Sequence, residues 1–85
     1  MNLNKQNLVN KIKYRAQYRG TKEMDRFVNL FVNKIINNLN IDELEHLNKL
    51  INLNDEEILN ISNEKQKNII NNKIIKKLID FKKKY

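Results

Sequence analysis

A single glycine and the absence of proline constrain this chain more than any other feature. In 85 residues, Gly20 is the one position free of the usual restrictions on backbone conformation. The alternating pattern of β-branched and aromatic residues that marks strands is missing, whereas apolar residues recur with the 3.6-residue period of a helix. The sequence therefore predicts an all-α fold, a small compact bundle of about five helices.

Five helical segments are expected, joined by short connections. The first ends at Gly20, because glycine readily takes the positive φ found at helix C-termini. Thr21 is the predicted N-cap of the second segment, and Asn40 with Glu43 forms a predicted capping box at the start of the third. Asn54 is predicted to cap the fourth in the same way. The five expected segments are residues 5–19, 22–38, 41–51, 55–61 and 63–82.

Length and composition favour one small domain with a modest core. A chain of 85 residues hides roughly 60–65% of its unfolded surface, and we treat residues 1–85 as a single helical domain whose ends, 1–4 and 83–85, fray. The absence of cysteine excludes disulfides and thiolate metal sites. Residues 1–10 lack a signal peptide, and no apolar run approaches the roughly 20 residues that span a bilayer. We therefore expect a cytoplasmic protein with no membrane insertion.

Charge is distributed unevenly along the chain. The net charge of +7 is made up of +6 in residues 1–22, −6 in residues 23–64 and +7 in residues 65–85. Such asymmetry favours electrostatic steering toward a partner, or attraction between segments of the chain itself. Basic residues interleaved with aromatic ones, here Tyr14 and Tyr18, can also bind RNA or single-stranded DNA. We expect no nucleic-acid partner, but a small basic nucleic-acid-binding or antitoxin-like regulator stays open as the alternative function.

Groups suited to catalysis are scarce. His46 is the only histidine and Ser62 the only serine, and nothing in the sequence places them together. A lone histidine without cysteine lacks the partners for a zinc site, and one glycine cannot build a glycine-rich phosphate loop. The sequence therefore predicts no enzyme, no catalytic residues and no metal site.

One constellation remains, the string Arg19-Gly20-Thr21-Lys22-Glu23-Met24-Asp25, which we call the 19–25 motif. It lies at the expected corner between two helices, where glycine allows the backbone of a partner to approach closely. Its alternating charges offer both donors and acceptors, which suits protein recognition. The competing interpretation is structural: Gly20 ends a helix, and the acids Glu23 and Asp25 only complement the helix dipole.

The motif and its flanks resemble a known family. Tyr14-Arg15-Ala16 followed by the 19–25 motif is similar to the tyrosine-arginine-small and arginine-glycine-x-x-glutamate-x-aspartate pattern of succinate dehydrogenase flavinylation (FAD) assembly factors, bacterial type. The resemblance covers roughly residues 5–61. Two features depart from the family. Ile61 stands near a position where tryptophan is common, and residues 63–82 have the pattern of an uninterrupted helix where a turn with glycine and proline commonly follows.

The resemblance implies a function. Such factors bind the flavoprotein subunit of succinate dehydrogenase and promote covalent attachment of FAD to one of its histidines, with fumarate reductase left open as a second client. FAD is then attached to the client protein. We expect no tight FAD binding by this chain, because no dinucleotide-binding fold fits it. The free factor is expected to be a monomer.

The resemblance also implies which residues meet the client. Arg19 and Glu23 would make polar contacts, Gly20 would permit close approach, and Asp25 would contact the client or hold the corner. Arg15 is a candidate to pair with Asp25 across the helical hairpin. The expected partner-binding residues are Arg19, Gly20, Thr21, Lys22, Glu23 and Asp25, supported by Tyr14 and Arg15.

Overall fold

The computed structural model describes residues 3–17, 20–65 and 73–85, and all regular structure within these ranges is helical. This confirms the predicted all-α fold with about five helices. The elements are α1 (Leu3–Gln17), α2 (Lys22–Ile35), the short 3-10 helix η1 (Ile36–Asn38), α3 (Ile41–Ile51), α4 (Asp55–Ser62) and α5 (Lys73–Lys84).

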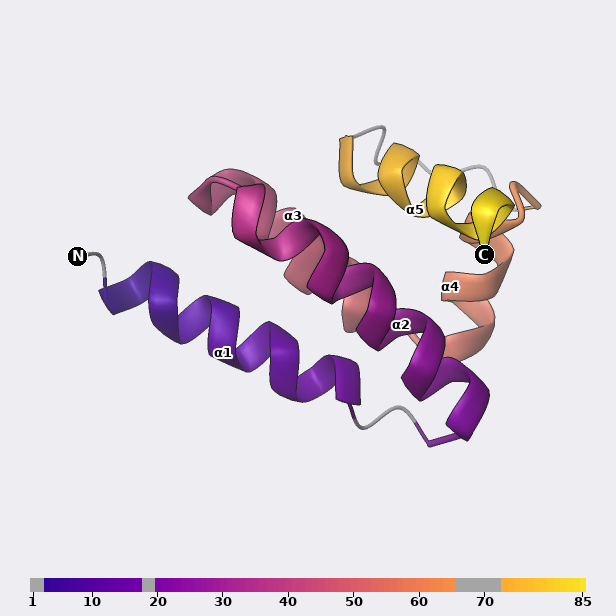
Figure 1. Ribbon diagram of the computed structural model, residues 1–85, viewed down its shortest axis with the longest axis horizontal. Coiled ribbons are helices and arrows are strands. Elements are labelled where there is room, and N and C mark those ends of the chain that lie inside the picture. Colours follow the sequence, from indigo (N-terminus) through magenta and orange to yellow (C-terminus); the bar gives the residue numbers. More distant parts are fainter. Residues whose placement is uncertain (1–2, 18–19, 66–72) are drawn as a thin grey trace.

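The helices pack as a bundle around α2 and α3. In Figure 1, α1 and α2 lie side by side as an antiparallel pair, and α3 contacts α1. On the side of the molecule remote from α1, α5 packs against both α3 and α4. The bundle measures 39 × 28 × 21 Å along its principal axes. The start of α2 therefore lies near two other elements, α4 and the end of α5.

One core unites all five α-helices. α2 contributes most, because its apolar residues recur at helical spacing and form one continuous buried face. The Ser62 side chain is also buried, and its hydroxyl donates a hydrogen bond to the carbonyl of Leu59 at 2.9 Å. The buried apolar residues are Ile12, Ala16, Met24, Phe27, Val28, Phe31, Val32, Ile36, Leu39, Leu44, Leu47, Leu50, Ile51, Ile58, Ile61, Ile74 and Leu78.

Asparagine side chains cap the starts of α3 and α4, as predicted. The Asn40 side chain accepts a hydrogen bond from the Glu43 backbone N–H at 2.8 Å, and the Glu43 carboxylate accepts one from the Asn40 N–H at 3.0 Å. This reciprocal arrangement is a capping box. At α4, the Asn54 side chain accepts from the Glu57 N–H at 2.8 Å, so the predicted cap forms there as a single bond, without the reciprocal bond of the predicted capping box. Backbone donors that α3 and α4 cannot satisfy internally thus find partners.

The capping box predicts a measurable stability effect. Asn40→Ala removes the acceptor for the Glu43 N–H, so it should destabilise the fold by about 1 kcal/mol. For a domain of this size, that loss lowers Tm by about 4–8 °C in a thermal melt followed by circular dichroism. The control is Asn33→Ala on exposed α2 surface, where alanine's helix propensity offsets one weak side-chain hydrogen bond. Equal melting temperatures for the two variants would contradict the prediction.

The prediction of one uninterrupted helix over residues 63–82 is wrong at its N-terminal end. Helix α4 continues to Ser62, and a turn follows in which Glu64 has a positive φ of 59°. The described part of α5 begins at Lys73. The intervening residues 66–72 lie outside the described residues, so the helix predicted there is not tested.

Backbone hydrogen bonds explain why the chain turns at this point. The Lys65 N–H donates to the Asn60 carbonyl at 2.8 Å, and the Glu64 N–H donates to the Ile61 carbonyl at 3.1 Å. Together these bonds form a Schellman motif, which satisfies the last carbonyls of α4. The left-handed position is usually glycine, and Glu64 occupies it here. The sequence therefore carries no glycine to signal the end of this helix.

Helix boundaries elsewhere differ only slightly from the predicted ones. The last turn of the segment predicted over 22–38 is the 3-10 helix η1. The structure assigns α1 from Leu3 and α5 to Lys84, and the fraying predicted for residues 1–4 and 83–85 stays a prediction. Ring contacts between α5 and α2 hold the last turn of α5 in place.

Candidate protein-binding site

The corner before α2 carries the described part of the 19–25 motif. Gly20 has a φ of +115°, which confirms the prediction that glycine supplies a positive φ after the first helix. Apart from its chain neighbours, a Cβ built on Gly20 would meet no atom of the described residues within 4 Å. The chain itself therefore needs glycine for its backbone conformation, and the space over the glycine is open to a partner.

Thr21 caps α2 as predicted. Its backbone is extended, and its hydroxyl accepts a hydrogen bond from the Met24 N–H at 3.2 Å. The Asp25 N–H donates to the Thr21 carbonyl at 2.9 Å. Glu23 and Asp25 lie in the first turn, where the helix dipole favours negative charge. These bonds account structurally for Thr21, but not for the exposed carboxylate of Glu23.

The two acids of the motif lie on different sides of α2. At about 100° per residue, positions two apart are separated by about 160° around the helix axis. Asp25 is half-buried, whereas Glu23 and Lys22 are exposed. Near the end of α1, Arg15 is exposed, and Tyr14 exposes 65% of its surface. The motif thus offers Glu23 and Lys22 directly to a partner.

Two of the predicted assignments are not tested by the geometry. Arg19 lies outside the described residues, so its contact with a client stays a prediction. The pairing of Arg15 with Asp25 also stays a prediction. Asp25 is engaged in an interaction within the fold, which agrees with its half-buried position.

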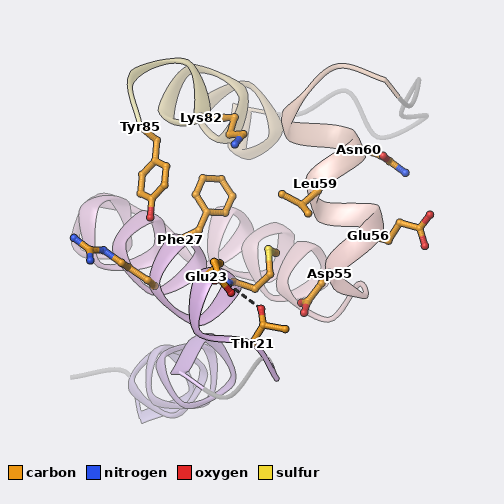
Figure 2. A pocket seen from close by; sticks show the side chains of 11 residues that line it. Thr21, Glu23, Phe27, Asp55, Glu56, Leu59, Asn60, Lys82 and Tyr85 are labelled. Carbon is orange, nitrogen blue, oxygen red and sulfur yellow. Dashed lines mark hydrogen bonds between the residues drawn. The ribbon is translucent and has the colours of Figure 1, made fainter.

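A groove opens beside the motif, between the start of α2, helix α4 and the end of α5 (Figure 2). Its volume is about 880 Å³. Thr21 and Glu23 belong both to the 19–25 motif and to this groove. The residues that line it are Thr21, Glu23, Met24, Arg26, Phe27, Asp55, Glu56, Leu59, Asn60, Lys82 and Tyr85.

The rings of Phe27 and Tyr85 line the groove, and the Phe81 ring packs against both from outside its lining. The Tyr85 ring meets Phe27 edge-on, with 5.1 Å between ring centroids, and Phe81 lies 5.6 Å from Phe27 and 5.5 Å from Phe31. The Lys82 ammonium sits 5.5 Å from the centroid of Phe27. Such ring pairs and cation–ring contacts stabilise the packing beyond simple burial. They fix the end of α5 against α2, one turn beyond Glu23.

The rim of the groove carries charges of both signs. Glu23, Asp55 and Glu56 come from the first turns of α2 and α4, Arg26 follows Glu23 on α2, and Lys82 lies near Tyr85 at the end of α5. Within the described ranges, neither the Glu23 nor the Arg26 side chain has a hydrogen-bond or ion-pair partner. Exposed, unpaired charges next to an apolar surface are suited to contact with another protein.

Other candidate chemistries find no organised site among the described residues. The Ser62 hydroxyl is buried and bonded to its own helix, whereas His46 is exposed on α3. Residues 3–17, 20–65 and 73–85 contain no group of three or more metal-binding side chains arranged to hold an ion. None of the described helices is long and apolar enough to cross a bilayer.

Comparison with known families gives a match over residues 10–82, to the Sdh5 family, described as the flavinator of succinate dehydrogenase. The match includes the whole 19–25 motif and the residues of the groove as far as Lys82. It extends further toward the C-terminus than the resemblance noted from the sequence, which covers roughly residues 5–61. Comparisons with curated proteins and with solved structures found no significant match. The family match lends no support to the alternative of a nucleic-acid-binding regulator.

Proposed function

Since this chain belongs to the Sdh5 family, the flavinators of succinate dehydrogenase, we propose that it binds the flavoprotein subunit of that enzyme through the 19–25 motif. Its role in flavinylation follows from the family. What we propose is the surface of this chain that contacts the flavoprotein subunit. The observation that carries it is the corner itself, where open space over Gly20 is followed three residues later by the exposed carboxylate of Glu23, which has no partner within the described ranges.

The factor acts by binding. The flavin and a histidine of the client supply the chemistry of the covalent bond. This chain stabilises the client conformation in which those two groups are aligned, which is an effect of proximity and population. FAD becomes covalently attached to the client protein, and the factor itself does not bind FAD tightly. An assembly factor needs no catalytic side chain for this task.

Four residues of the motif then have a proposed role. Glu23 accepts hydrogen bonds from the client, and Gly20 lets the client backbone come close. Arg19 is assigned a second polar contact. Asp25, which is half-buried, holds the corner or reaches the client at its edge. Arg15 and the exposed Tyr14 on α1 support the same surface.

Co-purification with the flavoprotein subunit tests the proposal. The tagged full chain should retain the subunit from cells that express both, and the subunit should carry covalent flavin, seen as in-gel fluorescence after denaturation. In cells without the factor, the fluorescence should be much weaker at equal subunit levels. Normal fluorescence without the factor, or failure of the two proteins to associate, would contradict the proposed function.

A further inference from the structure

We infer that the groove between α2, α4 and α5 receives an apolar side chain of the flavoprotein subunit, with a basic residue of the same segment lying against its acidic rim. This inference rests on the proposed function and deepens it, because it assigns a second contact surface and the chemistry of the segment that fills it. The surface lies outside the 19–25 motif except where the two share residues at the start of α2.

The interior of the groove selects for an apolar group. Figure 2 shows the Phe27 ring and the Leu59 side chain extending into the space between the three helices, with Tyr85 at the end of α5. Tyr85 exposes 56% of its surface although its ring contacts Phe27. Phe27 is already buried in the core, so an apolar side chain seated here would cover mainly the exposed part of Tyr85 and the half-buried Leu59, and removing them from water favours binding.

The charges on the rim select for a neighbouring cation. The exposed Glu23 and Glu56 and the half-buried Asp55, which is engaged in an interaction within the fold, line the groove at the starts of α2 and α4. The nearby Lys82 ammonium lies over the Phe27 ring, so this cation already has an interaction partner within the fold. A basic residue of the partner would find complementary charge along the acidic edge and repulsion at Arg26 and Lys82. The charge pattern therefore fixes the orientation of the segment as well as its composition.

The groove shares residues with the 19–25 motif, and this indicates that both contact the same partner. Thr21 and Glu23 line the groove and belong to the motif, so a protein that contacts Glu23 reaches the groove across one unbroken surface. The groove is also larger than one side chain needs, with a volume of about 880 Å³. A segment of the same flavoprotein subunit is thus the occupant that the surface favours over an unrelated ligand.

Photo-cross-linking tests the identity of the occupant. The full chain is prepared with p-benzoylphenylalanine in place of Tyr85, mixed with purified flavoprotein subunit and irradiated. Mass spectrometry should then locate the cross-link in a subunit segment that holds an apolar residue next to Lys or Arg. Cross-linking to a second copy of this chain, or to a subunit segment without that pair, would overturn the inference.

Binding measurements with substituted chains provide the second test. Tyr85→Ala should weaken binding about fivefold, whereas Tyr85→Phe, which keeps the ring, should bind like the parent. Glu56→Lys reverses a charge on the rim and should weaken binding by a similar factor, with Glu45→Lys on exposed α3 as the matched control. Glu56 is exposed, so its replacement tests the groove even if Tyr85→Ala loosens α5.

The outcomes separate this inference from the proposed function. If Glu23→Ala loses binding while Tyr85→Ala and Glu56→Lys both bind like the parent, the groove is not a contact and the motif remains one. If the parent chain itself fails to bind the subunit, both proposals fall together.

Discussion

Replacing Glu23 with alanine is expected to weaken binding of the flavoprotein subunit about tenfold or more while the helical bundle stays folded. Glu23 is exposed in the first turn of α2, so losing its charge removes only about 0.3–1 kcal/mol of helix-dipole stabilisation. Truncating one member of a hydrogen-bonded charge pair buried in an interface instead costs about 2–5 kcal/mol of binding. Titration calorimetry gives the affinity, and a thermal melt gives the stability.

A matched carboxylate on another helix controls for the loss of charge. Glu45 is exposed on α3 and belongs neither to the motif nor to the groove, so Glu45→Ala should bind like the parent. Covalent flavin on the subunit should fall in cells that carry Glu23→Ala and not in those that carry Glu45→Ala. If Glu23→Ala supports normal binding and flavinylation, the carboxylate serves only the helix dipole and the proposed contact is wrong.

Gly20→Arg is expected to abolish client binding without unfolding the protein. Among the described residues other than its chain neighbours, no atom lies within 4 Å of a Cβ at this position, so a side chain can leave the backbone here without a clash at its first carbon. The positive φ makes any other residue strained, by about 1–3 kcal/mol. The arginine side chain would project into the space that the client backbone enters. Co-purification with the subunit and circular dichroism measure the two effects separately.

The Gly20→Ala variant separates the effect of side-chain size on binding from the effect of backbone strain on stability. Alanine suffers the same unfavourable φ but adds only a methyl group, so it should keep most of the binding and show a similar loss of stability. Loss of folding in both variants would make the glycine purely structural. Binding by both variants at the parent's affinity would remove the corner from the contact surface.

Local chemistry explains which parts of the fold could be predicted. The caps at Thr21 and Asn40 involve side chains that bond to a backbone group three residues away, so their signal lies within one short segment. The same holds for Gly20, whose identity indicates its conformation. Glu64 gives no such signal, because its left-handed backbone is imposed by the turn after α4 and its side chain does not favour it.

The two parts of the candidate site, the motif and the groove, differ in the same way in how far the sequence predicts them. The 19–25 motif is continuous along the chain, so its amino-acid pattern alone identifies it. The groove is built from residues 21–27, 55–60 and 82–85, and only tertiary packing brings them together. A weak signal for it does exist in the sequence. Phe27 and Phe31 are four residues apart and share one face of α2, and Phe81 on α5 is followed four residues later by Tyr85, just after the helix ends.

The aromatic contact between α5 and α2 has a practical consequence for handling the protein. A purification tag or fluorophore attached at Tyr85 would stand beside the groove and obstruct the proposed contact. In Figure 1 the start of α1 lies at the opposite end of the bundle from the end of α5. Reporters for interaction assays therefore belong at that end, where they leave the groove accessible.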